Sequence, residues 1–174
     1  MTRLLLFLLL AIAGALVVVS GCKKDQPPVT IFIEKDAINN SKILLTDAVN
    51  SHAKSVVSSG RISLGMELKI ISIDSQNECN ELEEGEICIS GDSVTSGYWN
   101  KDNSALFYEL DGKQFLRTGD LGFLYQEELF VHGRLKEMLI IRGKNYFPYD
   151  IEQLVSESDV SIEPNGVAVF SFND

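Results

Sequence analysis

The chain has 174 residues, of which 45% are hydrophobic and 23% are charged. This is the composition of a globular protein that is long enough to bury a core. Its formal net charge is -10 and its sequence pI is near 4.6. Nucleic-acid binding needs clustered Lys and Arg, so this acidic excess excludes nucleic acid as an expected partner.

The first 22 residues have the pattern of an export signal. Arg3 precedes a continuous apolar run over 4–19, and the sequence VSGC follows directly, ending at Cys22. VSGC resembles the bacterial lipobox, which implies lipidation of Cys22. The alternative is a retained membrane anchor, but about sixteen apolar residues fall short of the roughly twenty that span a bilayer. We therefore expect a hydrophobic signal helix, followed by a polar tether over 23–28.

The other two cysteines, Cys79 and Cys88, and the two histidines, His52 and His132, show no metal-ligand spacing. No metal site is therefore expected. A disulfide between Cys79 and Cys88 is one alternative for an oxidising compartment. Their different settings, a polar loop and a predicted strand, favour two free thiols.

Alternating apolar and polar residues predict three strands in the first half of the chain, at 29–34, 66–73 and 85–90. Residues 42–45 form another apolar patch, and the pattern over 47–59 is ambiguous. Either Asn100 or Asp102 is expected to cap a short helix that ends near Phe107.

The second half is predicted to hold short strands and one helix. The predicted strands lie at 114–116, 121–125, 128–132, 138–142 and 166–172. The first two flank a Thr-Gly-Asp turn, and 128–132 forms a hairpin with 121–125. Pro148 occupies a first-turn position of a helix that reaches about Ser158, with an apolar stripe at Ile151, Leu154 and Val155. The last pattern is still incomplete at Asp174, which we interpret as truncation.

Three motifs follow one another in the second half of the chain. GEI begins at 85 with GYWN ending at 100, RTGDLG spans 117–122, and GRLK at 133–136 is followed by PYDIE at 148–152. In this order and spacing they resemble motifs of the adenylate-forming enzymes. The sequences LRTGDLGFL, ELFV and IIRGKN are most similar to those of the fatty acyl-AMP ligases. The strong resemblance covers 83–152, and a weaker one reaches back to about residue 28.

The resemblance implies an α+β fold in two parts, behind the signal segment 1–22. Residues 29–134 would be the C-terminal part of the family's large N-terminal domain, forming a small β-rich subdomain shaped like a distorted barrel. Residues 135–174 would be the start of the family's mobile α+β C-terminal domain.

The resemblance also assigns nucleotide contacts. Asp120 would accept hydrogen bonds from the two ribose hydroxyls, and Arg134 would donate to a ribose hydroxyl or a phosphate oxygen. Thr118 and Gly119 would support the turn that carries Asp120, because a glycine allows a close backbone approach to a ligand.

The hinge of the family corresponds to Lys136 and Glu137. The family usually has an aspartate where this chain has Glu137, so the charge is kept on a longer side chain. Rotation about a few such residues is the way in which hinged domains move.

The resemblance implies ATP-dependent activation of a fatty acid, with Mg²⁺, to an acyl-adenylate. The chain contains no Ser/Thr/Gly-rich phosphate loop and no residue at the position of the family's C-terminal catalytic lysine. We therefore expect no catalytic residue, no tightly bound cofactor and no activity of the chain alone. A separately encoded N-terminal portion is one expected partner.

The membrane is the other expected partner, through the lipid or the signal segment. The chain would be a membrane-anchored lipoprotein if the signal is used, and cytoplasmic if the start site is misassigned. The alternative function is therefore a tethered lipoprotein that uses the β-rich subdomain as a binding or interaction module.

Overall fold

The computed structural model describes residues 11–12, 15–16, 28–34, 42–142, 144–163 and 166–171. Cys22 and nearly all of the expected signal helix and tether lie outside these ranges. The four described residues of the signal segment form two short paired strands, β1 (Ala11–Ile12) and β2 (Ala15–Leu16), and not a helix. The signal helix therefore stays a prediction. Among the described residues, no helix has both the length and the apolar character to cross a bilayer.

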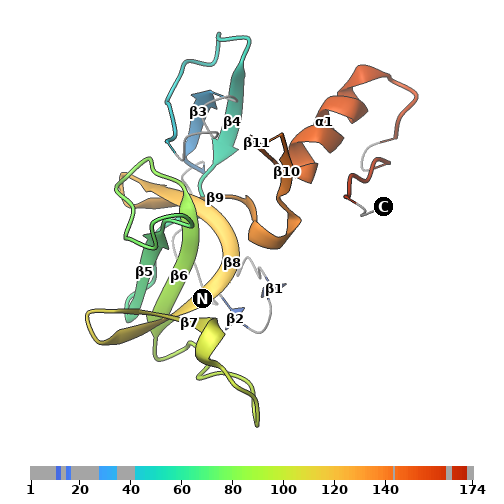
Figure 1. Ribbon diagram of the computed structural model, residues 1–174. Helices are drawn as coiled ribbons and strands as arrows, with labels where there is room; N and C mark the ends of the chain where they lie inside the picture. The colour runs from blue at the N-terminus through green and yellow to red at the C-terminus, as the bar shows by residue number, and fades with distance from the viewer. Residues whose placement is uncertain are drawn as a thin grey trace, which may run out of the picture.

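The main sheet is antiparallel and curls around the long strand β8 (Lys113–Tyr125), as Figure 1 shows. On one side of β8 lies β6 (Gly85–Gly91), and β5 (Met66–Ile71) pairs with β6. The other side of β8 is shared. β7 (Phe107–Leu110) pairs with its first residues, and β9 (Glu128–Arg134) pairs with its last. The expected β-rich, barrel-like part is thus confirmed as a curled sheet.

Two smaller antiparallel sheets flank the main one. β3 (Thr30–Glu34) pairs with β4 (Ala53–Val57), and β10 (Leu139–Ile141) pairs with β11 (Lys144–Tyr146). The single-turn 3-10 helix η2 (Ser104–Leu106) precedes β7, and η3 (Leu135–Glu137) follows β9. The only α-helix in the described part of the chain is α1 (Pro148–Ser158).

One apolar cluster joins the main sheet, the β3–β4 sheet and the start of α1. Its buried members come from β3, β4, the segment between them, the β8–β9 hairpin and the residue before α1: Ile33, Ile43, Val56, Leu121, Phe123, Phe130 and Phe147. The rings of Phe123 and Phe130 stack with centroids 5.1 Å apart. A second cluster lies within the main sheet, around Ile70, Ile87, Ile89, Leu116 and Leu129. Because burying one such side chain stabilises a fold by about 1.5–3 kcal/mol, these clusters fix the curl of the sheet.

Most strands that alternation predicted are confirmed. The predicted strands at 29–34, 66–73 and 85–90 correspond to β3, β5 and β6, and the predicted hairpin corresponds to β8 and β9. The helix begins at Pro148, as expected for a residue that lacks an N–H and has a fixed φ.

Some expectations about local structure are wrong or incomplete. The ambiguous segment 47–59 contains β4, and β11 was not predicted. The short helix near Phe107 is the 3-10 turn η2, whose N-cap is Asn103 without a side-chain cap bond. Asp102 instead accepts a hydrogen bond from the Ser104 N–H. Residues 166–171 are not a strand. There the Val169 N–H donates to the side chain of Glu152 on α1.

Candidate functional site

Residues 117–120 lie inside β8 and do not form a turn between two strands. The pairing of β8 with β6 continues on both sides of them, but its register shifts between Glu86 and Cys88. Gly119 takes up this irregularity with φ +74°, a left-handed conformation that other residues adopt at a cost. No heavy atom lies within 4 Å of the place where a Cβ would stand on Gly119, so the backbone conformation is what requires glycine.

A buried carboxylate on β6 anchors this irregular segment. Glu86 is 4% exposed and accepts hydrogen bonds from the Nε of Arg117, at 2.8 Å, and from the N–H of Gly119, at 3.1 Å. The Nη2 of Arg117 lies 2.6 Å from the same carboxylate. No sequence pattern predicts this role of Glu86. The available signal is its place in the GEI motif, which accompanies RTGDLG in the same resemblance.

Thr118 adds a second bond between this segment and β6. Its Oγ1 donates to the carbonyl oxygen of Ile87 at 2.7 Å and accepts from the N–H of Asp120 at 3.1 Å. Thr118 is itself buried. The backbone before Asp120 is therefore fixed by side-chain hydrogen bonds from both β6 and β8.

Asp120 and Arg134 face each other across β8 and β9, where they are paired in register. The Nε of Arg134 donates to Oδ1 of Asp120 at 3.0 Å. Asp120 is 3% exposed, whereas 31% of the Arg134 side chain is exposed. Burial raises the pKa of Asp120, while the Arg134 guanidinium acts in the opposite direction. The pair is thus a carboxylate on the inside with a cationic fork at the surface.

The expected hinge residues follow this pair at once. Arg134 ends β9 with an extended backbone, and the next residues form η3, which contains Lys136 and Glu137. Both are exposed, and Oε1 of Glu137 lies 4.0 Å from Nη1 of Arg134. The structure therefore brings the predicted residues from 118 to 137 into one region. The predicted lipidation residue, Cys22, lies outside the described residues.

A second polar cluster was not anticipated. It brings together Lys54 on β4, Glu84 just before β6, His132 on β9 and Asp150 on α1. Lys54 forms an ion pair with Asp150. Glu84 Oε1 and both ring nitrogens of His132 are buried and have no hydrogen-bond partner among the described residues.

Burial governs the ionisation of the two unpartnered groups in this cluster. Burial raises the pKa of Glu84 to about 7 and lowers that of His132 to about 4. In both cases Lys54 acts to lower the pKa and Asp150 acts to raise it, since their charges lie close by.

Neither the cysteines nor the acidic groups point to a metal or redox site. Cys79 and Cys88 are free thiols, and burial raises their pKa values to about 11 and about 12, which leaves both protonated and unreactive at neutral pH. Within the described ranges, no group of His, Cys, Asp and Glu side chains has metal-binding geometry.

Comparison with known proteins supports the resemblance of the motifs. No protein-family model matches the chain. The long-chain-fatty-acid–AMP ligase FadD32 of Mycolicibacterium smegmatis is 30% identical over 176 residues, which cover 92% of this chain and 28% of that protein. The medium-chain-fatty-acid–[acyl-carrier-protein] ligase JamA of Moorena producens is 33% identical over 159 residues, which cover 87% of this chain and 27% of that protein.

Solved structures agree with these sequence matches. A structure from a study of fatty acyl-adenylate ligases of E. coli and L. pneumophila matches with TM-score 0.65 and 31% identity, over 75% of this chain and 23% of that one. The fatty acid AMP ligase from Legionella pneumophila matches with TM-score 0.59 and 33% identity, over 86% of this chain and 26% of that one. The chain is therefore a relative of the fatty acyl-AMP ligases that spans little more than a quarter of the length of the curated proteins it matches.

Proposed function

We propose that this chain supplies the ribose-binding segment and the hinge of an adenylate-forming enzyme of the fatty acyl-AMP ligase type. The observation that carries the proposal is the Asp120–Arg134 pair, which joins the irregular segment of β8 to the residue directly before η3. The names of the relatives support a fatty acid as the substrate class.

The reaction explains the residue types at this place. A fatty-acid carboxylate attacks the α-phosphate of ATP, forming an acyl-adenylate and releasing pyrophosphate, and bound Mg²⁺ would offset charge on the phosphates. Catalysis of this kind depends on the orientation of the nucleotide and on charge stabilisation. Asp120 would accept hydrogen bonds from the ribose hydroxyls. The guanidinium of Arg134 would donate hydrogen bonds to the sugar or to a phosphate oxygen, a role that suits its planar set of N–H donors.

The rest of the reaction centre lies outside these 174 residues. The sequence contains no phosphate-binding loop, and the chain covers 28% of FadD32. Our proposal is accordingly that the chain alone does not form acyl-adenylates. Pyrophosphate release by the purified chain, with ATP, Mg²⁺ and medium- and long-chain fatty acids, measures this directly. Turnover above the protein-free background would contradict this part of the proposal.

A chimera tests the positive part. Residues 29–174 replace the matching segment of FadD32, and acyl-adenylate formation is measured for the chimera and for its Asp120→Asn variant. Loss of the charged acceptor should lower kcat/KM by roughly 10- to 100-fold, since a hydrogen bond to a charged group contributes about 1.5–3 kcal/mol. Asp92→Asn, at an exposed aspartate, is the matched control. Equal activity of the two variants in a folded, active chimera would refute the role of Asp120.

A further inference from the structure

The helix α1 is held to the β-rich part mainly at its N-terminal end. Phe147, just before the helix, is 4% exposed and lies in the main apolar cluster. Its ring lies so close to Gly133 on β9 that a Cβ there would stand 2.5 Å from Cδ1 of Phe147. None of the helical residues is buried, and Leu154 in its middle is 57% exposed. Figure 1 shows α1 extending away from the main sheet. A helix with one attached end is released at lower cost than one packed along its length.

Lys54 makes the polar part of this attachment. Its side chain is 15% exposed and its Nζ forms an ion pair with Asp150 in the first turn of α1. The same Nζ lies 6.0 Å from the centre of the Tyr149 ring, at the outer limit of a cation–π contact. Lys54 thus joins β4 to α1 across 96 residues of sequence. Breaking a partly buried pair of this kind leaves a charge without its partner, which is costly unless another partner is near.

Glu84 is a second carboxylate on which the charge of Lys54 acts. It is 8% exposed, and its Oε1 has no hydrogen-bond partner in the described part of the chain, which is unusual for a buried carboxylate. The charges of both Lys54 and Asp150 act on it. Two carboxylates therefore compete for one ammonium group, and only Asp150 belongs to the helix.

From these contacts we infer that Lys54 is a charge-exchange latch: it pairs with Asp150 while α1 is docked and passes to Glu84 when α1 leaves the sheet. The exchange keeps Lys54 paired in both states, so release of the helix does not leave a buried ammonium alone. The segment 166–171 moves with α1, because the Val169 N–H is bonded to Glu152. This inference concerns contacts among the described residues and does not depend on adenylation.

The pKa of His132 should depend on whether α1 is docked. Its ring meets the Phe147 ring edge-on with centroids 4.6 Å apart, and both its nitrogens are buried. The charged groups that act on it are Lys54 from β4 and Asp150 from α1, and the same two groups act on Glu84 in the segment before β6. When Phe147 withdraws, water reaches the imidazole and its pKa returns toward the ordinary value.

The test uses the full chain, with hydrogen exchange of the α1 amides and NMR titration of His132. Lys54→Gln should speed exchange in α1 by about tenfold or more without altering the helix sequence. Asp150→Asn should raise the pKa of His132 from about 4 toward 6.5, although loss of a nearby negative charge alone would lower it. The direction of that shift therefore separates undocking from a local electrostatic effect.

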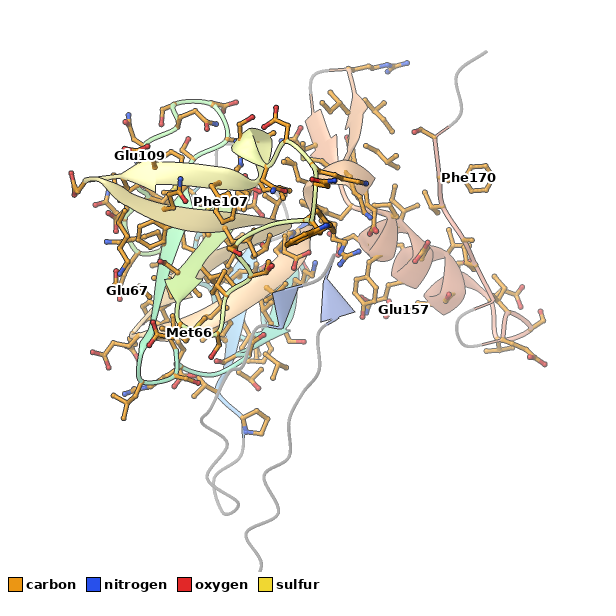
Figure 2. All side chains as sticks on the ribbon, turned by 90° about the horizontal axis from the view of Figure 1, so that it is seen from below. Met66, Glu67, Phe107, Glu109, Glu157 and Phe170 are labelled. Atoms are coloured by element: carbon orange, nitrogen blue, oxygen red, sulfur yellow. The ribbon has the colours of Figure 1, made fainter. Side chains whose placement is uncertain are left out.

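The Glu84→Gln variant tests the exchange itself. It removes the alternative acceptor and should slow α1 exchange by about tenfold. If a Lys54 or Asp150 variant loses the exchange protection of β8, that variant has unfolded as a whole, and Glu84→Gln then decides the question. Glu67→Gln is the control. Oε1 of Glu67 pairs with Nζ of Lys113 at 2.6 Å on the main sheet, and Figure 2 shows Glu67 away from Glu157, on α1, and from Phe170. Unchanged α1 exchange in Lys54→Gln, or unchanged or faster exchange in Glu84→Gln, would overturn the inference.

Discussion

Glu84 and His132 should oppose each other in the dependence of stability on pH. The folded state raises the pKa of Glu84 from 4.5 to about 7 and lowers that of His132 from 6.5 to about 4. Glu84 therefore favours folding below about pH 4.5, and this contribution is lost as pH rises to about 7. His132 behaves in the opposite way. Its burial as the neutral form costs nothing above about pH 6.5 and costs progressively more as pH falls to about 4.

One unit of pKa shift corresponds to about 1.4 kcal/mol, which sets the size of each effect. Between pH 5 and pH 7 the cost from Glu84 rises from about 1 to about 3 kcal/mol, while that from His132 falls from about 2 kcal/mol to near zero. The two changes nearly cancel, so this cluster contributes an almost flat profile to the wild-type chain. In Glu84→Gln the free energy of unfolding, measured relative to wild type, should rise by about 2 kcal/mol from pH 5 to pH 7. In His132→Gln it should fall by about the same amount.

Urea unfolding at pH 5, 6 and 7 measures these differences. Far-ultraviolet circular dichroism is the suitable signal, because Trp99 is 94% exposed and its fluorescence would change little on unfolding. Glu67→Gln should follow wild type within about 0.5 kcal/mol at each pH, since exposed ion pairs contribute little. If the difference in unfolding free energy between Glu84→Gln and wild type is the same at pH 5 and pH 7, the pKa of Glu84 does not differ between the folded and unfolded states, which contradicts this prediction.

Three further predictions concern other parts of the chain. Gly133→Ala should destabilise the fold by about 1–3 kcal/mol in urea unfolding, because the new Cβ overlaps Phe147, and adding Phe147→Leu should recover part of the loss; a larger loss in the double variant would contradict this. Glu86→Gln should cost about 1–3 kcal/mol by weakening the bonds to Arg117 and the Gly119 N–H, and a thermal unfolding midpoint equal to wild type would exclude that anchoring role. Cys22 should be labelled by a fatty-acid probe in bacterial cells and Cys22→Ser should not, so an unlabelled wild type would remove the lipoprotein hypothesis.

Local pattern was sufficient to predict the strands with regular alternation and the helix that begins at Pro148. It failed for β4, because AKSVV is short and mixes polar with apolar residues, and its pairing with β3 is settled by Val56 in the shared core. It also placed a turn at Gly119. The structure keeps β8 continuous there because Glu86 and Thr118 satisfy the backbone across the irregularity, and hydrogen bonds from a neighbouring strand are not visible in local sequence.

The candidate site, too, could be predicted only in part from the sequence. The residues 118–120 and 134–137 are close in sequence and could be selected from their motifs. The cluster of Lys54, Glu84, His132 and Asp150 could not, because its members come from four elements and the ion pair spans 96 residues. No spacing rule connects such residues, and each alone has the pattern of an ordinary surface or strand residue.

The RTGD motif can now be explained residue by residue from its contacts. Arg117 pairs with Glu86, Thr118 bonds to Ile87, Gly119 supplies the left-handed backbone and Asp120 pairs with Arg134. Three of these four residues also bond to β6, since the Gly119 N–H donates to Glu86. The fourth leads through Arg134 to the first residue of η3. Rotation at η3 would therefore shift the partner of Asp120 before it disturbed the segment that carries Asp120. In the proposed enzyme, the ribose contact and the position of the hinge would be coupled through this one ion pair.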